Sequence, residues 1–220
     1  MNPLKILLLV ILTLSWQISS AAESDFDCKG TPSPVNRMIC TDPNLTALDQ
    51  QLYLAFKQAL VAAPESAELL EQWQDNWLST YGLEDCQTAK CLAASFSKRI
   101  DLLKAVSPSS RSTPNRNGSY TRYRKGKPDS DGAQVSLLAL AGKRFYMSGF
   151  ATWQHPNPAY SSHTGDFKGL AHLTPSGSYT YQNEYCAIEA KFSGKKLVLK
   201  QKEPGCGGMN VSFDGVYLKD

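Results

Sequence analysis

The sequence predicts an α+β protein of two domains, in which a disulfide-stapled N-terminal helical bundle precedes a small antiparallel β barrel or sandwich. Before residue 107 the apolar residues recur every three or four positions, as on one face of a helix. After residue 117 they alternate with polar residues between short turns, which is typical of strands. Six cysteines are spread over both halves, so covalent cross-links are expected in each.

Residues 1–22 have the pattern of a secretory signal peptide. Lys5 precedes the apolar run 6–14, and Ser20-Ala21-Ala22 forms a small-residue cleavage site. The run is shorter than the ~20 residues of a membrane-spanning helix, and we see no second apolar stretch long enough to span. We therefore expect export to the periplasm or secretion, from a Gram-negative bacterium, and no transmembrane segment in the mature chain.

The even number of cysteines favours three disulfides, because small exported domains are commonly cross-linked. The expected bonds are local and join Cys28 to Cys40, Cys86 to Cys91, and Cys186 to Cys206. Crossed pairings among the first four cysteines stay open, because four cysteines allow three connectivities. The C-x4-C pair alone is weak evidence for zinc, and the three histidines show no ligand spacing. No metal and no cofactor is expected.

Residues 23–106 are predicted to be the helical domain. Asp42-Pro43 places a capping carboxylate before a proline in the first helical turn. Three apolar stripes at helical spacing then follow, which are Leu45, Leu48, Leu52, Phe56 and Leu60; Leu70, Trp73, Trp77 and Tyr81, closed by Gly82; and Leu92, Phe96, Ile100 and Leu103. The helical spacing indicates that the two tryptophans belong to the core and do not form a sugar-binding platform.

Residues 107–117 are rich in Ser, Pro and Asn and are predicted to be a linker. Residues 118–220 form the predicted β domain. Its seven strand candidates are 118–123, 134–142, 144–153, 164–174, 178–192, 195–202 and 210–220. The first and the last both contain Gly-x-Tyr, at Gly118 and Gly215, which suggests that they pair and close the sheet.

Charge divides at the same place as the structural pattern. Residues 23–106 contain 12 acidic and 7 basic residues, a net charge of −5, whereas residues 107–220 contain 8 acidic and 15 basic residues, a net charge of +7. Such asymmetry bears on binding partners and not on the fold.

The helical half resembles the LprI-type lysozyme-inhibitor N-terminal domain family over about residues 26–104. The residues that carry the resemblance are Cys28, Pro34-Val35, Ile39-Cys40, Asp42-Pro43, Leu45, Leu48-Asp49, Gln74, Trp77-Leu78, Cys86, Cys91-Leu92, Phe96, Arg99-Ile100 and Leu103. The resemblance implies an extracytoplasmic location and lysozyme inhibition, and it supplies no catalytic residues. The β half looks only loosely like the small barrels of other periplasmic lysozyme inhibitors, and such a likeness is architectural.

The expected function is therefore inhibition of a lysozyme-type muramidase by binding. The candidate contact residues are Thr31, Pro32, Ser33 and Pro34 in one loop, and Glu84 and Asp85 in the turn 83–90, which ends just before Cys91. The alternative is an envelope-associated module whose basic β domain binds anionic lipid or glycan without inhibiting anything. Nucleic acid is not an expected partner. Nor is the chain expected to be an enzyme, because its acidic pairs lie on the polar side of a predicted helix.

Two short motifs of the β half are expected to be structural and not functional. Asp129–Gly132 has the start of a calcium-loop pattern but lacks the later ligands, so a turn is expected. The basic and aromatic stretch 120–127 suggests contact with an acidic polymer, but a solvated edge strand protected by positive charge is favoured.

Overall fold

The computed structural model describes residues 33–78, 86–108, 115–157 and 159–220. Helices come first: α1 (Pro34–Thr41), α2 (Pro43–Ala62), the 3-10 turn η1 (Pro64–Ser66), α3 (Ala67–Asn76) and α4 (Ala89–Lys104). The predicted signal peptide, residues 1–22, and the predicted helix end at Tyr81 and Gly82 lie outside the described residues.

Side-chain caps explain where the helices begin. The Asp42 carboxylate accepts hydrogen bonds from the backbone N–H of Asn44 at 2.9 Å and of Leu45 at 3.3 Å, and Pro43 occupies the first turn of α2, as predicted. Thr88 accepts from the N–H of Cys91 and caps α4. The predicted stripes on α2 and α4 are confirmed, since Leu52, Phe96 and other members are fully buried.

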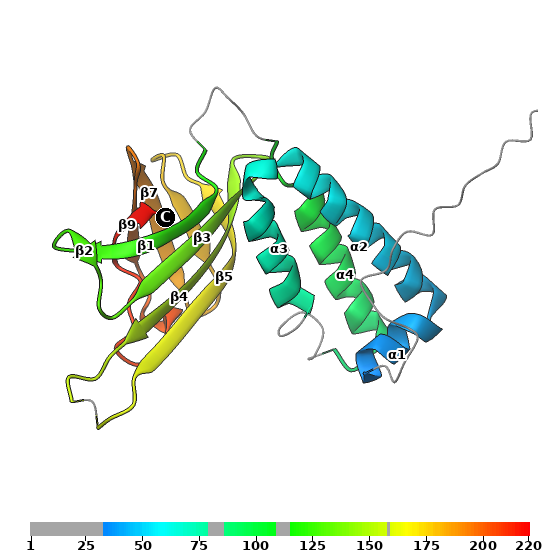
Figure 1. Cartoon of the computed structure of the whole chain (residues 1–220), viewed down its shortest axis with the longest axis horizontal. Helices are drawn as coiled ribbons and strands as arrows, with labels where there is room; N and C mark the ends of the chain where they lie inside the picture. Colours follow the sequence, from blue (N-terminus) through cyan, green and yellow to red (C-terminus); the bar gives the residue numbers. More distant parts are fainter. Residues whose placement is uncertain (1–32, 79–85, 109–114, 158) are drawn as a thin grey trace, which may run out of the picture.

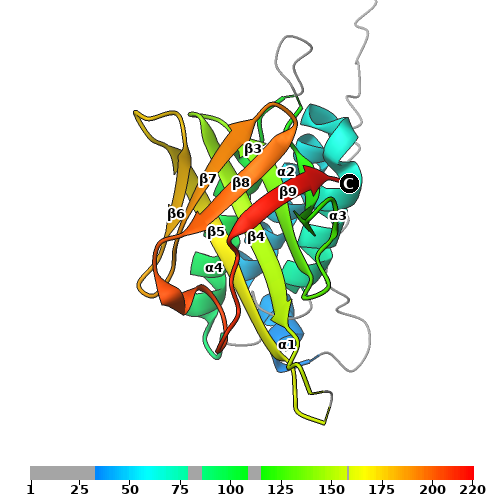
Figure 2. The ribbon, with the colours of Figure 1, turned by 90° about the vertical axis from the view of Figure 1, so that its left-hand side faces the viewer.

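The second half forms an antiparallel sheet that closes on itself (Figures 1 and 2). Its strands are β1 (Gly118–Arg124), β2 (Lys127–Pro128), β3 (Ala133–Leu140), β4 (Arg144–Trp153), β5 (His163–Leu173), β6 (Tyr179–Gln182), β7 (Ala187–Ser193), β8 (Lys196–Gln201) and β9 (Gly215–Lys219), with a 3-10 turn η3 (Pro204–Cys206) between the last two. Strands β1 and β3 to β9 pair in chain order, and β2 forms a short hairpin with β1.

The expected closure between the first and last strands is confirmed, and the sheet is a barrel. Strand β1 pairs with β9 in the register Tyr120↔Lys219 and Arg122↔Tyr217. Strand β1 therefore has neighbours on both sides, so its interpretation as a charge-protected edge strand was wrong.

The single strand predicted over 178–192 is two strands. Strand β6 ends at Gln182 and β7 begins at Ala187. Between them the Asn183 side-chain oxygen accepts hydrogen bonds from the backbone N–H of Tyr185 at 2.9 Å and of Cys186 at 2.7 Å. This side-chain turn reverses the chain although the alternating pattern continues on both sides of it.

The barrel interior is filled by apolar side chains from all eight closing strands. They include Val135, Leu137, Met147, Phe167, Ile188, Leu197 and Tyr217, with Phe213 from the segment before β9. The Tyr217 hydroxyl donates to the backbone oxygen of Phe213 at 2.9 Å, which satisfies the polar end of this buried ring.

The helices pack on the outer face of the barrel, so their core is shared with it (Figure 1). Alternation along β3 places Leu137 in the barrel interior and Leu138 against the helices, where it is fully buried. The rings of Trp73 on α3 and Tyr146 on β4 meet edge-to-face with centroids 4.7 Å apart. The helical half is thus a layer on strands β3 and β4 as well as a group of helices packed on one another.

Both ends of the predicted linker are fixed to the barrel. The Ser107 N–H donates to Ala139 at 3.0 Å, and the Ala141 N–H donates to Ala105 at 2.7 Å. At the other end the Asn117 amide donates to the Ser66 hydroxyl at 2.9 Å and accepts from the Ala139 N–H at 2.7 Å. Asn117 is itself buried, so one side chain joins η1 to β3.

We predict that Leu138→Ala lowers the free energy of unfolding by about 2–4 kcal/mol, because it leaves a cavity between the two layers. Urea unfolding followed by far-UV circular dichroism measures the loss. The matched control is Phe150→Ala, which removes a half-exposed ring on the outer face of β4 and should cost under about 1 kcal/mol. Equal losses in the two variants would show that the shared cluster contributes little.

Candidate functional site

The two predicted contact loops are only partly within the described residues. Ser33 and Pro34 are exposed at the start of α1, where the Ser33 hydroxyl accepts from the Asn36 N–H at 3.1 Å and caps the helix. Thr31, Pro32, Glu84 and Asp85 lie outside the described residues. Their convergence on one binding surface therefore stays a prediction.

The disulfide predictions agree with the structure wherever it describes both partners. Cys86 is bonded to Cys91, with Cα atoms 5.4 Å apart, and Cys186 to Cys206, with Cα atoms 4.4 Å apart. Cys40 is also disulfide-bonded, and its predicted partner Cys28 lies outside the described residues. Within the described ranges no group of His, Cys, Asp and Glu side chains could hold a metal ion.

Residues that carry the family resemblance are mainly core residues. Arg99 on α4 is 6% exposed, and its Nε donates to the Gln74 side chain of α3 at 3.0 Å. The guanidinium lies 5.7 Å from the centre of the Trp77 ring. Burial lowers the pKa of Arg99 to about 10, which still leaves it charged at neutral pH. The resemblance therefore reflects how α3 and α4 pack. Trp73 is a core residue as predicted, and Trp77 is partly buried against the core.

An acidic stripe runs along the exposed side of η1 and α3. We use this name for Glu65, Glu68, Glu71 and Asp75, which are spaced by three or four residues and are all exposed. Residues 64–76 contain no lysine or arginine. The opposite side of α3 is buried through Leu70 and Trp73, so the stripe faces away from the core.

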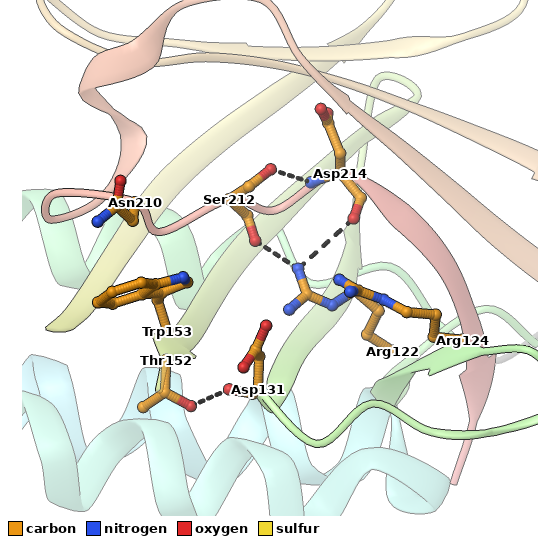
Figure 3. A pocket seen from close by; sticks show the side chains of 8 residues that line it. All are labelled: Arg122, Arg124, Asp131, Thr152, Trp153, Asn210, Ser212 and Asp214. Atoms are coloured by element: carbon orange, nitrogen blue, oxygen red, sulfur yellow. Dashed lines mark hydrogen bonds between the residues drawn. The ribbon is translucent and has the colours of Figure 1, made fainter. Parts of the chain in front are cut away.

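A polar pocket of about 310 Å³ opens at one end of the barrel (Figure 3). Strands β1 and β4 supply Arg122, Arg124, Thr152 and Trp153. The turn before β3 supplies Asp131, and the segment before β9 supplies Asn210, Ser212 and Asp214. We call this feature the barrel-mouth pocket.

Arg122 lines the pocket and is held in place by several polar contacts. It is 4% exposed, and its Nε lies 2.7 Å from Oδ2 of the buried Asp129, which also lies 3.1 Å from Nη2 of Arg124. Arg122 Nη1 donates to the backbone oxygens of Ser212 and Asp214 (Figure 3). Buried and paired in this way, Arg122 is not available to an acidic polymer, contrary to the suggestion for the stretch 120–127.

The segment before β9 is held in place by covalent and steric constraints. The Cys186–Cys206 bond ties η3 to the start of β7. Gly165 on β5 and Gly207 approach so closely that an added Cβ on Gly165 would lie 2.3 Å from the Gly207 Cα. The Asp214 carboxylate accepts from the Gln201 N–H at 2.5 Å. These contacts fix the backbone that carries Asn210, Ser212 and Asp214.

This pocket was not predicted from the sequence. The turn at Asp129–Gly132 is confirmed, with the Gly132 N–H donating to Asp129 at 2.9 Å and Gly132 at φ 66°. One signal was available for Arg122, since it lies two residues after Tyr120 on the same strand, and such residues share a face of the sheet. Nothing local indicated that residues 210–214 meet Trp153.

Comparison with known proteins gives a weak but extended similarity. Three mycobacterial proteins named "Lipoprotein LprI", one from Mycobacterium bovis and two from strains of Mycobacterium tuberculosis, are each 26% identical over 156 residues. The match covers 62% of this chain and 78% of each relative. No family model and no solved structure matches.

The match extends beyond the helical half, which was the part of the chain with a recognised family resemblance. Residues 1–106 are fewer than half of the chain, so a match over 62% includes part of the barrel half. The fold and the comparison together define an α+β protein that is similar to LprI beyond the helical half. Within the described residues no helix is both long and apolar enough to cross a membrane.

We predict that Asp129→Ala destabilises the barrel by about 3 kcal/mol, because it leaves the buried Arg122 charge without its partner. Urea unfolding measures the change. Asp166→Ala removes an exposed carboxylate from β5 and is the control, with an expected change within about 0.5 kcal/mol. A loss no larger than that of the control would mean that the ion pair does not support the fold.

Proposed function

We propose that the protein is an exported envelope protein that binds and inhibits a lysozyme-type muramidase. The observation that carries the proposal is the similarity to LprI over 62% of the chain, together with the resemblance of the helical half to the lysozyme-inhibitor domain family. The disulfides support an exported location, because such bonds persist in oxidising compartments. The activity is one of binding and does not involve catalysis by this chain.

The acidic stripe gives the proposal a physical basis. Lysozymes that attack bacterial walls are commonly basic, so an acidic surface speeds their encounter by electrostatic steering. Glu68, Glu71 and Asp75 project from a helix that is held against the barrel through Trp73 and Tyr146. A fixed row of carboxylates keeps its orientation relative to the rest of the surface, which favours a defined complex over random contact.

Inhibition also requires an element that covers the catalytic cleft of the lysozyme. We assign this role to the loop that contains Thr31, Pro32, Ser33 and Pro34 and to the turn that contains Glu84 and Asp85. In the sequence the second loop directly precedes the Cys86–Cys91 bond, and the first loop is followed six positions after Pro34 by the disulfide-bonded Cys40. Covalent restraint lowers the entropy lost when such loops become ordered on binding.

The charge-reversal variant Glu68→Lys/Glu71→Lys tests this proposal in a cell-wall lysis assay. The full mature chain is assayed at low salt against chicken-type, goose-type and invertebrate-type lysozymes. Inhibition of the sensitive lysozyme should weaken about tenfold, mostly through slower association, because the steering charges are reversed. Stopped-flow binding separates the association rate from the dissociation rate.

The matched control is Asp166→Lys/Glu184→Lys, which makes the same change in net charge at exposed positions of the barrel. It should weaken inhibition by less than about threefold. Failure of the unmodified chain to slow any of the three lysozymes at micromolar concentration would refute the proposed function. Equal effects of both variants would refute the role of the acidic stripe alone.

A second function is favoured by the charge of the barrel half. The β7–β8 hairpin and its flanks present exposed lysines at positions 191, 195, 196, 200 and 202, of which Lys202 pairs with Glu189 at 3.0 Å. We infer that this lysine-rich hairpin can attach the protein to anionic lipid or glycan surfaces of the envelope.

Vesicle sedimentation at low and physiological salt tests the attachment. The full chain should bind anionic vesicles at low salt and detach near physiological salt, because exposed charges are screened beyond ~8 Å there. Lys195→Gln/Lys196→Gln/Lys200→Gln should abolish most of this binding. Lys90→Gln/Lys98→Gln/Lys104→Gln removes the same charge from α4 and should retain it. Equal binding to neutral vesicles would contradict the electrostatic explanation.

A further inference from the structure

The barrel-mouth pocket has the composition of a carbohydrate site, and we propose that it binds a neutral oligosaccharide. None of the residues that line the pocket belongs to the acidic stripe or to the two contact loops, since they come from β1, β4 and the segments before β3 and β9. It has a volume of about 310 Å³, at the lower end of the range for small-ligand sites. The proposed ligand is a polyhydroxylated chain that carries no net charge.

The charges of the pocket favour a neutral ligand. The guanidinium groups of Arg122 and Arg124 and the carboxylate of Asp131 belong to residues that line it, and the Asp129 carboxylate pairs with both arginines, so the formal charges of these four groups cancel. Asp129 lies beneath and neutralises part of the arginine charge through its contacts of 2.7 and 3.1 Å. An anion would meet no excess of positive charge here, although the barrel half as a whole is basic.

The polar groups of the pocket mix hydrogen-bond donors and acceptors. Arg124 and the Asn210 amide are donors, and the Asp131 carboxylate and Ser212 hydroxyl accept. The nitrogen edge of the Trp153 indole faces the guanidinium of Arg122 across the pocket (Figure 3), and no hydrogen bond to this N–H occurs among the described residues. Sugar hydroxyls donate and accept at once, so a mixed lining suits them better than it suits a purely acidic or basic group.

An aromatic ledge continues from the pocket along the barrel rim. The Trp153 ring lies 5.0 Å from the His163 ring and 5.4 Å from the His155 ring, centroid to centroid, and His155 lies 4.6 Å from Tyr160. Tyr160 is 63% exposed, so the ledge ends at the surface. Aromatic rings offer flat apolar faces beside polar edges, and pyranose rings have the same division between C–H faces and hydroxyl edges. In the proposed complex, further sugar units beyond the pocket lie against this ledge.

The site is formed before any ligand arrives. Arg122 is fixed by Asp129 and by the backbone oxygens of Ser212 and Asp214. His163 is held by its ring nitrogen, 2.6 Å from the Met209 backbone oxygen. Rigid placement of this kind reduces the entropy lost on binding, which matters for the weak interactions typical of neutral sugars.

Isothermal titration calorimetry on the full mature chain tests the proposal. The probes are chitotriose, cellotriose and maltotriose, with a polygalacturonate trimer and the dipeptide D-Ala-D-Ala as the anionic and zwitterionic comparisons. At least one neutral trisaccharide should bind with a dissociation constant of about 1 mM or tighter. Which one binds identifies the glycan class.

Variants then locate the binding. Trp153→Ala and Asp131→Asn should each weaken it at least tenfold. Phe150→Ala and Asp166→Asn are the matched controls on β4 and β5, and they should change it less than twofold. Asn210→Gly removes one side-chain amide, and glycine readily adopts the φ of 67° at that position. This variant is therefore expected to fold, and it tests the site even if Trp153→Ala unfolds the protein. Unfolding curves check each variant.

Three results would overturn the proposal. The first is the absence of binding for all three neutral trisaccharides. The second is tighter binding of the anionic trimer or the dipeptide, which would make the pocket an anion or zwitterion site. The third is neutral-sugar binding that Trp153→Ala, Asp131→Asn and Asn210→Gly all leave unchanged, which would place the sugar elsewhere on the protein.

Discussion

The pairing of β1 with β9 is the constraint on which the rest of the barrel depends. It joins residues about a hundred positions apart and turns an open sheet into a closed one. Closure places Arg122 opposite Tyr217, on the inner side, and so brings a guanidinium into a wall that is otherwise apolar. Burying that charge is costly unless it is paired, and Asp129 from the neighbouring hairpin supplies the pair. The barrel-mouth pocket lies where Arg122 and other polar side chains meet at the end of this closed wall.

The shared core explains why the helices keep a fixed position on the barrel. A layer of helices held only by a peptide linker would move relative to the strands, as domains joined by small polar interfaces commonly do. Here Leu138, Leu140 and Val106 are buried together with helix residues, and Asn117 bridges η1 and β3. The acidic stripe and the barrel mouth therefore belong to two layers that share a core, even though they differ in charge and in the ligands proposed for them.

The sequence predicted what depends on neighbours along the chain and missed what depends on distant ones. Asp42-Pro43 and the leucine stripes are local signals, so the starts and buried faces of α2 and α4 followed from them. The Cys86–Cys91 pair was predicted correctly because the two residues are close in sequence, and the Cys186–Cys206 pair because both lie beside the ends of the adjoining strands β7 and β8. The break at Asn183 was missed because strand alternation resumes after it. Asp131, Trp153 and Asn210 were not identified as one site, because only the closed barrel brings them together.

The Cys186–Cys206 bond has a consequence for the order in which the molecule matures. It anchors the segment that carries Asn210, Ser212 and Asp214, and that segment is among the last parts of the chain to be synthesised. The residues of the first wall, on β1 and β4, are synthesised earlier. The bond that restrains the opposite wall forms in a compartment that oxidises thiols. Under the proposed export, the second wall of the pocket therefore gains its covalent restraint only after the chain has left the reducing compartment in which it is made.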